Sequence, residues 1–280
     1  MKPAPFAYAA PESVAQVLRL LELHGEEGKI LAGGQSLIPL MNLRLAQPSV
    51  LIDLGAVRPL RYIRVEDGLI RIGAMTTQAD VEESRELEVV CPLLPELSSL
   101  VGHLQIRTRG TIGGSLAHAD PAAEIPMGLA ALSARVRIAS TAGVREMDAK
   151  AFVQGFLTTA LEASELLQEI IVPVPPSGHG YSVQEVARRH GDFAIVAVAC
   201  VVEPERGARV ALGGVADTPV LLELPLSGDA AVDASRLTAL ARDSISPTDD
   251  VHATADYRRD VAGELVSRAL REALDRMAGT

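Results

Sequence analysis

Hydrophobic positions in the first 55 residues switch between the helical and the strand period. A stripe with helical spacing predicts a helix that ends near Gly25. Its members are Val14, Val17, Leu18 and Leu21. Short apolar runs over residues 29–32 and 50–54 predict two strands, with a second helix over 37–45 between them. We therefore expect residues 1–55 to form a compact α/β unit.

Residues 56–175 show a different pattern. Alternating runs over 60–65 and 69–72 flank Asp67-Gly68, which predicts a β-hairpin. Asp120 followed by Pro121 predicts the N-terminus of a helix, with Asp120 as its N-cap. The other predicted elements are helices over 77–84, 92–101 and 149–155, strands over 135–140 and 167–172, and a glycine-rich loop over 107–115. A second mixed helix-and-sheet unit is the expected result.

Residues 173–180 are rich in Pro, Gly, Ser and His and predict a linker. Beyond it, the pattern predicts three strands, over 181–187, 194–202 and 208–215, followed by two helices. Residues 176–280 are therefore expected to form a small domain with a three-stranded sheet and helices. The fold class of the whole chain is predicted to be α+β, with boundaries at 1–55, 56–175 and 176–280.

Composition narrows the possible functions. The net charge of −10, the absence of Trp and the presence of only 4 Tyr and 4 Phe argue against a nucleic-acid surface, which needs clustered cations and stacking aromatics. Cys91 and Cys200, the two cysteines, cannot supply the four thiolates of an ordinary iron–sulfur cluster. Both lie in apolar runs, and we expect two buried, reduced thiols. No spacing of His, Asp or Glu predicts a metal site.

The sequence shows neither the apolar core of a signal peptide nor a run long enough to span a membrane. The expected location is the cytoplasm, without direct membrane insertion, so that contact with a membrane would need another subunit.

Two glycine-rich stretches are the main candidates for chemistry. They are residues 32–36, Ala-Gly-Gly-Gln-Ser, and residues 111–115, Thr-Ile-Gly-Gly-Ser. Glycine lets a ligand approach the main chain closely, and consecutive N–H groups in such a loop can bind an anion. Two such loops suit a pyrophosphate held from two sides, although each pair of glycines is also typical of an ordinary turn. The chain has no G-x-G-x-x-G fingerprint and no P-loop, so neither of those nucleotide folds is predicted. Ser36 and Ser115 have no base at a readable spacing, and no catalytic residue is predicted.

Four segments, taken in order, resemble one known family. Residues 30–53 and 101–124 are similar to the two FAD motifs of the molybdenum hydroxylase flavoprotein subunits, and residues 187–194 and 255–259 resemble two later motifs of the same proteins. These proteins are the medium subunits of the carbon monoxide dehydrogenase and xanthine dehydrogenase family.

The resemblance implies the two-subdomain FAD-binding fold of vanillyl-alcohol-oxidase-like flavoproteins, followed by the family's C-terminal flavoprotein domain. Two loops would wrap the pyrophosphate and ribityl chain of FAD. They comprise Leu31, Ala32, Gly33, Gly34, Gln35, Ser36 and Leu37, and Gly110, Thr111, Ile112, Gly113, Gly114 and Ser115. Val101 would lie near the adenine, and His118, Ala123 and Glu124 near polar parts of the cofactor. Leu167 would lie beside the flavin ring, which Phe193 would approach from the C-terminal domain.

Two positions depart from the family pattern. Many relatives carry a Lys just before the Ala-Arg-Arg stretch, close to the flavin ring, where this chain has Gln184-Glu185-Val186. A carboxylate there would oppose the anionic reduced flavin that a cation stabilises, which leaves the flavin potential and the oxidant open. Ser115 stands where several relatives have Asp or Asn, and it still offers a donor and an acceptor. Arg188-Arg189 fits either a solvated pair or a flavin-tuning role.

The function implied by the resemblance is electron transfer. The chain would take electrons from the [2Fe–2S] clusters of a small partner subunit, store them on FAD and pass them to quinone, cytochrome, oxygen or NAD. A large partner would hold the molybdenum cofactor and hydroxylate the substrate, in a dimer of heterotrimers. Two alternatives remain at this stage: a self-contained FAD oxidase of a small molecule, and a nucleotide-binding scaffold without activity.

Overall fold

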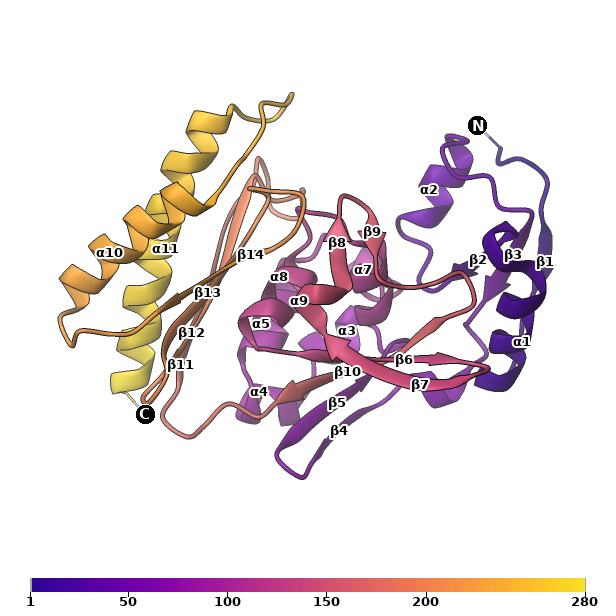
Figure 1. The fold of residues 1–280 in the computed structure, drawn as a ribbon, viewed down its shortest axis with the longest axis horizontal. Coiled ribbons are helices and arrows are strands. Elements are labelled where there is room, and N and C mark those ends of the chain that lie inside the picture. The colour runs from indigo at the N-terminus through magenta and orange to yellow at the C-terminus, as the bar shows by residue number, and fades with distance from the viewer. Residues whose placement is uncertain (1, 280) are drawn as a thin grey trace.

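A computed structural model describes residues 2–279 and arranges them around three main sheets that follow one another along the chain (Figure 1). The N-terminal sheet has the order β1-β3-β2, the central sheet β4-β5-β10-β6-β7, and the C-terminal sheet β11-β12-β13-β14. The short strands β8 and β9 form a separate hairpin. The N-terminal sheet is parallel and the other two are antiparallel, so the mixed α+β class is confirmed.

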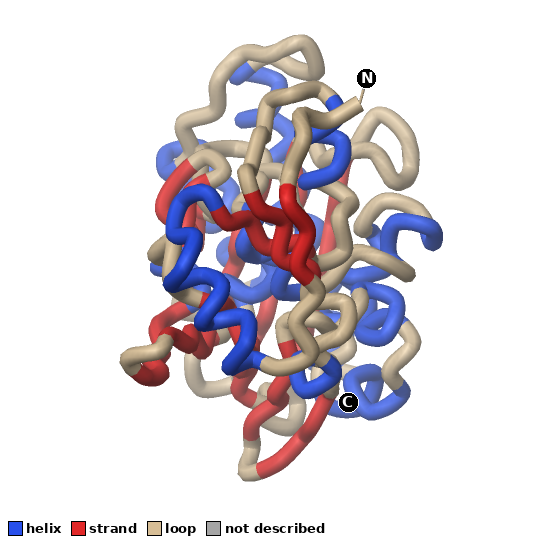
Figure 2. The backbone as a smooth tube through the Cα atoms, turned by 90° about the vertical axis from the view of Figure 1, so that its right-hand side faces the viewer, coloured by secondary structure: helices blue, strands red, loops and turns tan. Residues whose placement is uncertain are grey.

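The N-terminal sheet and its helices occupy one end of the molecule, which Figure 2 views from that side. Its elements are β1 (Ala7–Ala9), α1 (Val14–His24), the single turn η1 (Gly25–Glu27), β2 (Gly28–Leu31), α2 (Leu37–Asn42) and β3 (Val50–Asp53). Helix α1 starts at Ser13, whose hydroxyl accepts from the Gln16 amide, and ends at Gly25, where φ is +50°. The helices and strands predicted here are confirmed. Strand β1 was not predicted, because it is three residues long and mostly exposed.

The central part holds most of the short elements. They are η2 (Arg58–Leu60), β4 (Ile63–Glu66), β5 (Leu69–Gly73), α3 (Gln78–Glu82), α4 (Arg85–Val90), α5 (Leu93–Leu100), α6 (Leu104–Arg107), α7 (Ile112–His118), α8 (Glu124–Ala131), β6 (Arg135–Ser140), β7 (Gly143–Asp148), α9 (Ala149–Phe152), β8 (Val153–Gly155), β9 (Thr158–Thr159) and β10 (Leu166–Pro173). The predicted hairpin at Asp67-Gly68 is confirmed, with positive φ at both residues. Strand β7 and helix α4 were not predicted. Helix α9 ends at Phe152, short of the predicted residue 155.

Two predictions in this part were wrong. Residues 107–115 are not one loop, because α7 begins at Ile112 and includes Gly113, Gly114 and Ser115. The glycines are helical since the Thr111 hydroxyl accepts from the Gly114 amide at 3.0 Å and caps this helix. Asp120 does not cap a helix; its carboxylate accepts from the Ala122 amide in a turn, and α8 begins four residues later.

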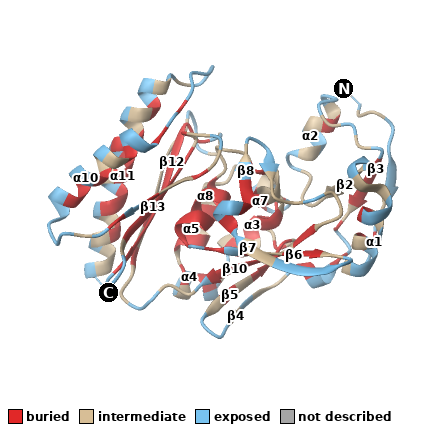
Figure 3. Ribbon diagram, viewed as in Figure 1, coloured by how far each residue is buried: buried red, intermediate tan, exposed pale blue. Residues whose placement is uncertain are grey.

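The C-terminal part consists of a sheet with two helices on its outer face (Figure 1). Its elements are β11 (Gly180–Val186), β12 (Val196–Glu203), β13 (Gly207–Gly213), β14 (Val220–Leu224), α10 (Ala230–Ser244) and α11 (Ala255–Ala278). The three-stranded prediction was short by one, because β14 adds an edge strand whose apolar run lacks the alternation of a half-buried strand. The inner face packs on α8 and α5, and buried residues concentrate between the layers (Figure 3).

Both cysteines are buried and unpaired, as predicted. Among the residues that the structure describes, no helix has the length and apolar character needed to cross a bilayer.

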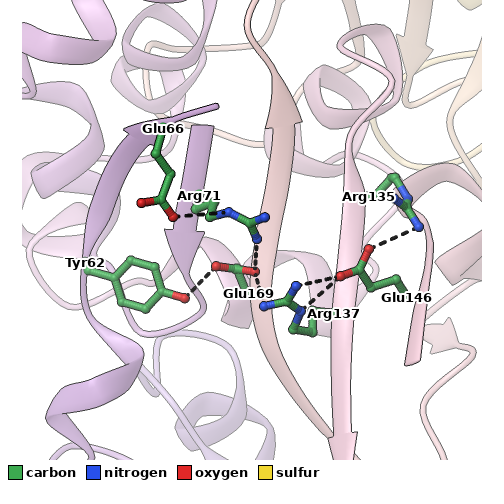
Figure 4. A network of polar contacts seen from close by, with 7 residues as sticks. All are labelled: Tyr62, Glu66, Arg71, Arg135, Arg137, Glu146 and Glu169. Atoms are coloured by element: carbon green, nitrogen blue, oxygen red, sulfur yellow. Dashed lines mark hydrogen bonds and ion pairs between the residues drawn. The ribbon is translucent and has the colours of Figure 1, made fainter. Parts of the chain in front are cut away.

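A polar network covers the face of the central sheet that is turned away from the helices (Figure 4). Its centre is Glu169, whose side chain is 4% exposed. The Glu169 carboxylate accepts from Arg71 at 3.0 Å and from the Tyr62 hydroxyl at 2.8 Å, and it lies 3.1 Å from Arg137. Because these residues come from β5, β6, β10 and the segment before β4, the network ties neighbouring strands together.

Replacing Glu169 by Gln should lower stability, since two arginines then lose the charge between them. We expect a loss of about 1–3 kcal/mol, less than for a fully buried pair because both arginines reach solvent. Glu66 is the matched control: it pairs with Arg71 at 3.4 Å but is 50% exposed. E66Q should cost about 0–1 kcal/mol. Urea unfolding of both variants measures the difference, and equal losses would contradict a central role for Glu169.

Candidate cofactor-binding site

The two glycine-rich stretches lie against each other. We call residues 32–36 loop 1 and residues 109–115 segment 2. A Cβ atom on Gly33 would lie 2.1 Å from the carbonyl oxygen of Arg109, and one on Gly114 would lie 3.3 Å from the side chain of Ala32. Only glycine allows loop 1 to approach the backbone of segment 2 this closely. The contact joins the N-terminal part to the central part at the predicted pyrophosphate site.

The amide groups of the two stretches are used differently. In segment 2, the amides of Ile112 and Gly113 donate to the carbonyl oxygens of Thr76 and Ala74, each at 3.0 Å, and Gly114 donates to Thr111. In loop 1, within the described part of the chain, the amides of residues 33–36 donate to no protein acceptor. Gly34 has a φ of +75°. Loop 1 can therefore form an anion nest, whereas segment 2 forms a wall beside it. Segment 2 offers fewer free N–H groups than loop 1, and the amide of Thr111, which lines the cavity, donates to no acceptor in the described part of the chain.

A cavity of about 510 Å³ opens at this contact. Ala32, Gly33 and Thr111 line it together with three arginines, Arg58, Arg61 and Arg109. Arg61 is paired with Asp80 at 2.8 Å, and Arg58 and Arg109 are exposed. Free amides and neighbouring guanidinium groups suit an anionic group such as a pyrophosphate.

A second cavity, of about 690 Å³, lies between the central part and the C-terminal part. We call it the interdomain cavity. Its walls are residues 120–122, Phe156 of the β8–β9 hairpin, residues 188, 189 and 191–195, residues 214–217, part of the connection between α10 and α11, and Arg258 of α11. Phe193 and Phe156, which are 72% and 63% exposed, contribute two apolar surfaces. The Gly214 amide donates to the Pro121 carbonyl at 2.8 Å and links two of the walls.

The structure brings only some of the predicted residues to these cavities. Phe193 lines the interdomain cavity, and loop 1 and segment 2 meet at the first one. His118 is half-buried at the end of α7, and burial lowers its pKa. Val101 is partly buried behind α5, where its carbonyl accepts from Arg107 at 3.2 Å. Leu167 is 4% exposed and packs in the central core, so the structure brings it to neither cavity.

Sequence reasoning missed several lining residues. Arg58 and Arg61 border the first cavity because they follow β3, whose carboxyl end points toward loop 1. The available signal was their position in the chain: both arginines follow β3, which pairs with β2, the strand that leads into loop 1. Phe156 was also missed. It follows Gly155 and is one of only 4 Phe in the chain, and such a position can indicate an aromatic side chain that is exposed for contact.

Two further carboxylates, Glu124 and Glu185, lie between the central part and the C-terminal part. Glu124 is the first residue of α8 and follows Ala123, the N-cap; burial raises its pKa to about 7. Burial also raises the pKa of Glu185 on β11 to about 7, and the neighbouring charge of Glu124 adds to the effect. Among residues 2–279, no group of three or more His, Cys, Asp or Glu side chains is placed to hold a metal ion.

Two family descriptions match the chain. The FAD binding domain in molybdopterin dehydrogenase matches residues 4–175, and the CO dehydrogenase flavoprotein C-terminal domain matches residues 181–273. Among curated proteins, the chain is 39% identical to the alpha subunit of the 6-hydroxypseudooxynicotine dehydrogenase complex of Paenarthrobacter nicotinovorans, over 100% of this chain and 98% of that protein. It is also 39% identical to the carbon monoxide dehydrogenase medium chain of Afipia carboxidovorans, over 98% of both chains.

Solved structures agree over the same length. Reconstituted CO dehydrogenase from Oligotropha carboxidovorans superimposes with a TM-score of 0.95 at 37% identity, covering 99% of this chain and 100% of that chain. Quinoline 2-oxidoreductase from Pseudomonas putida 86 gives a TM-score of 0.90 at 35% identity, covering 100% and 99% of the two chains. The predicted two-part FAD-binding fold followed by a C-terminal flavoprotein domain is thereby confirmed.

The contact between loop 1 and segment 2 predicts the effect of a single methyl group. G33A should force the two backbones apart and weaken FAD binding by about 10-fold or more, because the anion nest loses its geometry. G155A is the control, since its Cβ would find only the Thr158 side chain, at 4.0 Å. Fluorescence titration with FAD measures both affinities. Unchanged affinity in G33A would show that the contact does not shape the site.

Proposed function

The chain belongs to the FAD-binding flavoprotein subunits of the molybdenum hydroxylases, and from this premise we propose that it is the electron-transfer subunit of such an enzyme. It carries FAD, accepts electrons from [2Fe–2S] clusters on a small partner subunit and passes them to an external acceptor. Substrate hydroxylation takes place on a large partner subunit that holds the molybdenum cofactor. FAD supplies the ability to exchange electrons singly on one side and in pairs on the other.

The observation that carries the proposal is the contact between loop 1 and segment 2. Gly33, the first of four consecutive residues with free amides, permits the backbone contact and borders one cavity together with three arginines. This donor set fits the pyrophosphate of a dinucleotide, which carries negative charge but needs no metal when amides and guanidinium groups surround it. Residues 31–37 and 110–115 would hold the pyrophosphate and the ribityl chain.

The other residues have roles that depend on where the cofactor extends. Phe193, exposed in the interdomain cavity, supports a flavin ring placed there. His118 and Glu124, with Ala123 beside them, would contact polar parts of the cofactor, and Val101 the adenine. Leu167 is buried, so we propose that it supports the wall behind the ring rather than covering it.

The proposed partners follow from the family and from what this chain cannot carry. Its relatives are named as subunits or medium chains of larger enzymes. Cys91 and Cys200 are both buried, so the clusters must lie on another chain. We infer a dimer of heterotrimers, located in the cytoplasm and without direct membrane insertion. We also infer three structural parts, residues 1–55, 56–175 and 176–280.

The test is to purify the full chain with FAD and to assay it alone. We expect one FAD per chain, bleaching by dithionite, reoxidation by a quinone, and no turnover of small alcohols or N-heterocycles. Adding a co-purified [2Fe–2S] subunit in its reduced state should then bleach the flavin. Efficient turnover without partners would instead identify a self-contained oxidase, and failure to bind FAD would indicate a scaffold.

A further inference from the structure

Two carboxylates face each other across the boundary between the central and C-terminal parts. On β11, Ser182 and Gln184 bond to Glu272 of α11, so these residues face the outer helices. Alternate residues of a strand point to opposite faces, and Glu185 therefore points inward. Tyr181 and Val183, on the same face, pack against the central core. Glu185 pairs with Ala197 of β12, and β12 packs on α8, so the charge of Glu124 at the start of α8 acts on Glu185.

Neither carboxylate has a cation as partner in the part of the chain that the structure describes. Glu124 is 6% exposed, and one oxygen of Glu185 is buried without any hydrogen-bond partner. Glu169 provides a contrast within the same molecule, because it is equally buried but bonded to two arginines and a tyrosine. A buried carboxylate without such partners is costly in its charged form.

The charged groups on the surrounding elements do not neutralise the pair. Asp120, in the turn before α8, adds negative charge, and His118 at the end of α7 has a lowered pKa. The groups on α5, β12, β13 and α11 are engaged elsewhere: Glu96 and Glu272 with Arg276, and Glu203 with Arg209. Lys150 of α9 and Glu223 of β14 are exposed. Arg188 and Arg189 bond to the Val251 carbonyl and to Asp192.

Both members of the pair are close in sequence to walls of the interdomain cavity. Glu124 follows the wall formed by residues 120–122 by two positions, and Glu185 precedes the wall formed by residues 188–195 by three. We therefore expect negative charge in the cavity to raise the pKa of both carboxylates.

We propose that Glu124 and Glu185 form a proton-holding pair that couples the protonation of the protein to negative charge in the interdomain cavity. At neutral pH the pair holds a proton, and it takes up a further fraction of a proton from solvent when the cavity becomes more negative. The raised pKa values of both groups, each about 7, agree with this arrangement. No bond to the occupant forms or breaks. If the proposed function is right, the occupant is FAD. Reduction of the flavin then draws this further fraction of a proton into the pair, in addition to any proton that the flavin itself takes up.

The first test needs no cofactor. Because both pKa values are raised on folding, the pair's contribution to stability is complete below pH 4.5 and is lost as pH rises through about 7. The melting temperature of the apoprotein should therefore fall between these values. E185Q should reduce the fall by about 2–4 °C, and E124Q by a similar amount. E88Q, at an exposed position of α4, is the control and should follow the wild type.

E185K provides the opposite change. A lysine beside Glu124 creates the missing ion pair, so the melting temperature above pH 7 should rise relative to the wild type. A band of a protonated carboxyl group in the infrared spectrum at neutral pH, present in the wild type and weakened in E185Q, would identify the proton itself. Identical pH profiles of the wild type, E185Q and E124Q would overturn the proposal, whether or not the chain binds FAD.

The second test uses the chain loaded with FAD. Spectroelectrochemical titration should give a midpoint potential that depends more steeply on pH near 7 in the wild type than in E185Q or E124Q. If the potentials of the three proteins depend equally on pH while the apoprotein melting profiles differ as expected, the pair affects stability alone. The proposed link to the cavity would then be wrong. If FAD does not bind at all, the proposed function fails while the apoprotein test still decides whether the pair holds a proton.

Discussion

The approach of Gly33 to the backbone of Arg109 is the constraint on which the site depends. It brings a loop from a parallel α/β unit against a helix start in an antiparallel unit, with no side chain between them. The two stretches use their amides differently: those of Ile112, Gly113 and Gly114 in segment 2 donate within the protein, while those of residues 33–36 in loop 1 donate to no acceptor in the described part of the chain. A ligand that bridges the two parts can therefore use preformed donors without ordering a flexible loop, which lowers the entropic cost of binding.

Buried carboxylates appear in two arrangements in this chain, and the difference is informative. Glu169 is surrounded by Arg71, Arg137 and Tyr62 and acts as a structural tie across the sheet (Figure 4). Among the residues that the structure describes, Glu124 and Glu185 have no such cationic partners. A buried carboxylate without a partner is costly in its charged form, and groups with such shifted pKa values cluster at functional sites. We propose that the pair, which is close in sequence to the cavity walls, responds to the occupant of the interdomain cavity.

The sequence predicted the long elements and the family but not the details of the site. Strongly periodic segments such as α1 and α11, and the hairpin at Asp67-Gly68, were predicted because local pattern alone determines them. Helix α7 was taken for a loop because Gly113 and Gly114 have poor helix propensity, which close packing against Ala74 and the cap from Thr111 override. Strand β14 and the meeting of Glu124 with Glu185 depend on tertiary contacts, which no local pattern contains.

The sequence predicts no catalytic residue, and the proposed function does not require one. Electron transfer requires distance, orientation and a controlled electrostatic environment, and it requires no side chain that bonds to a substrate. The link from the Pro121 carbonyl through Gly214 to the buried Arg258 fixes the two walls of the interdomain cavity relative to each other. Arg258 also donates to the Ile195 carbonyl and pairs with Asp250 at 2.7 Å, so one guanidinium group holds three segments in place. A cavity whose walls are held in this way can tune a cofactor through the charges around it.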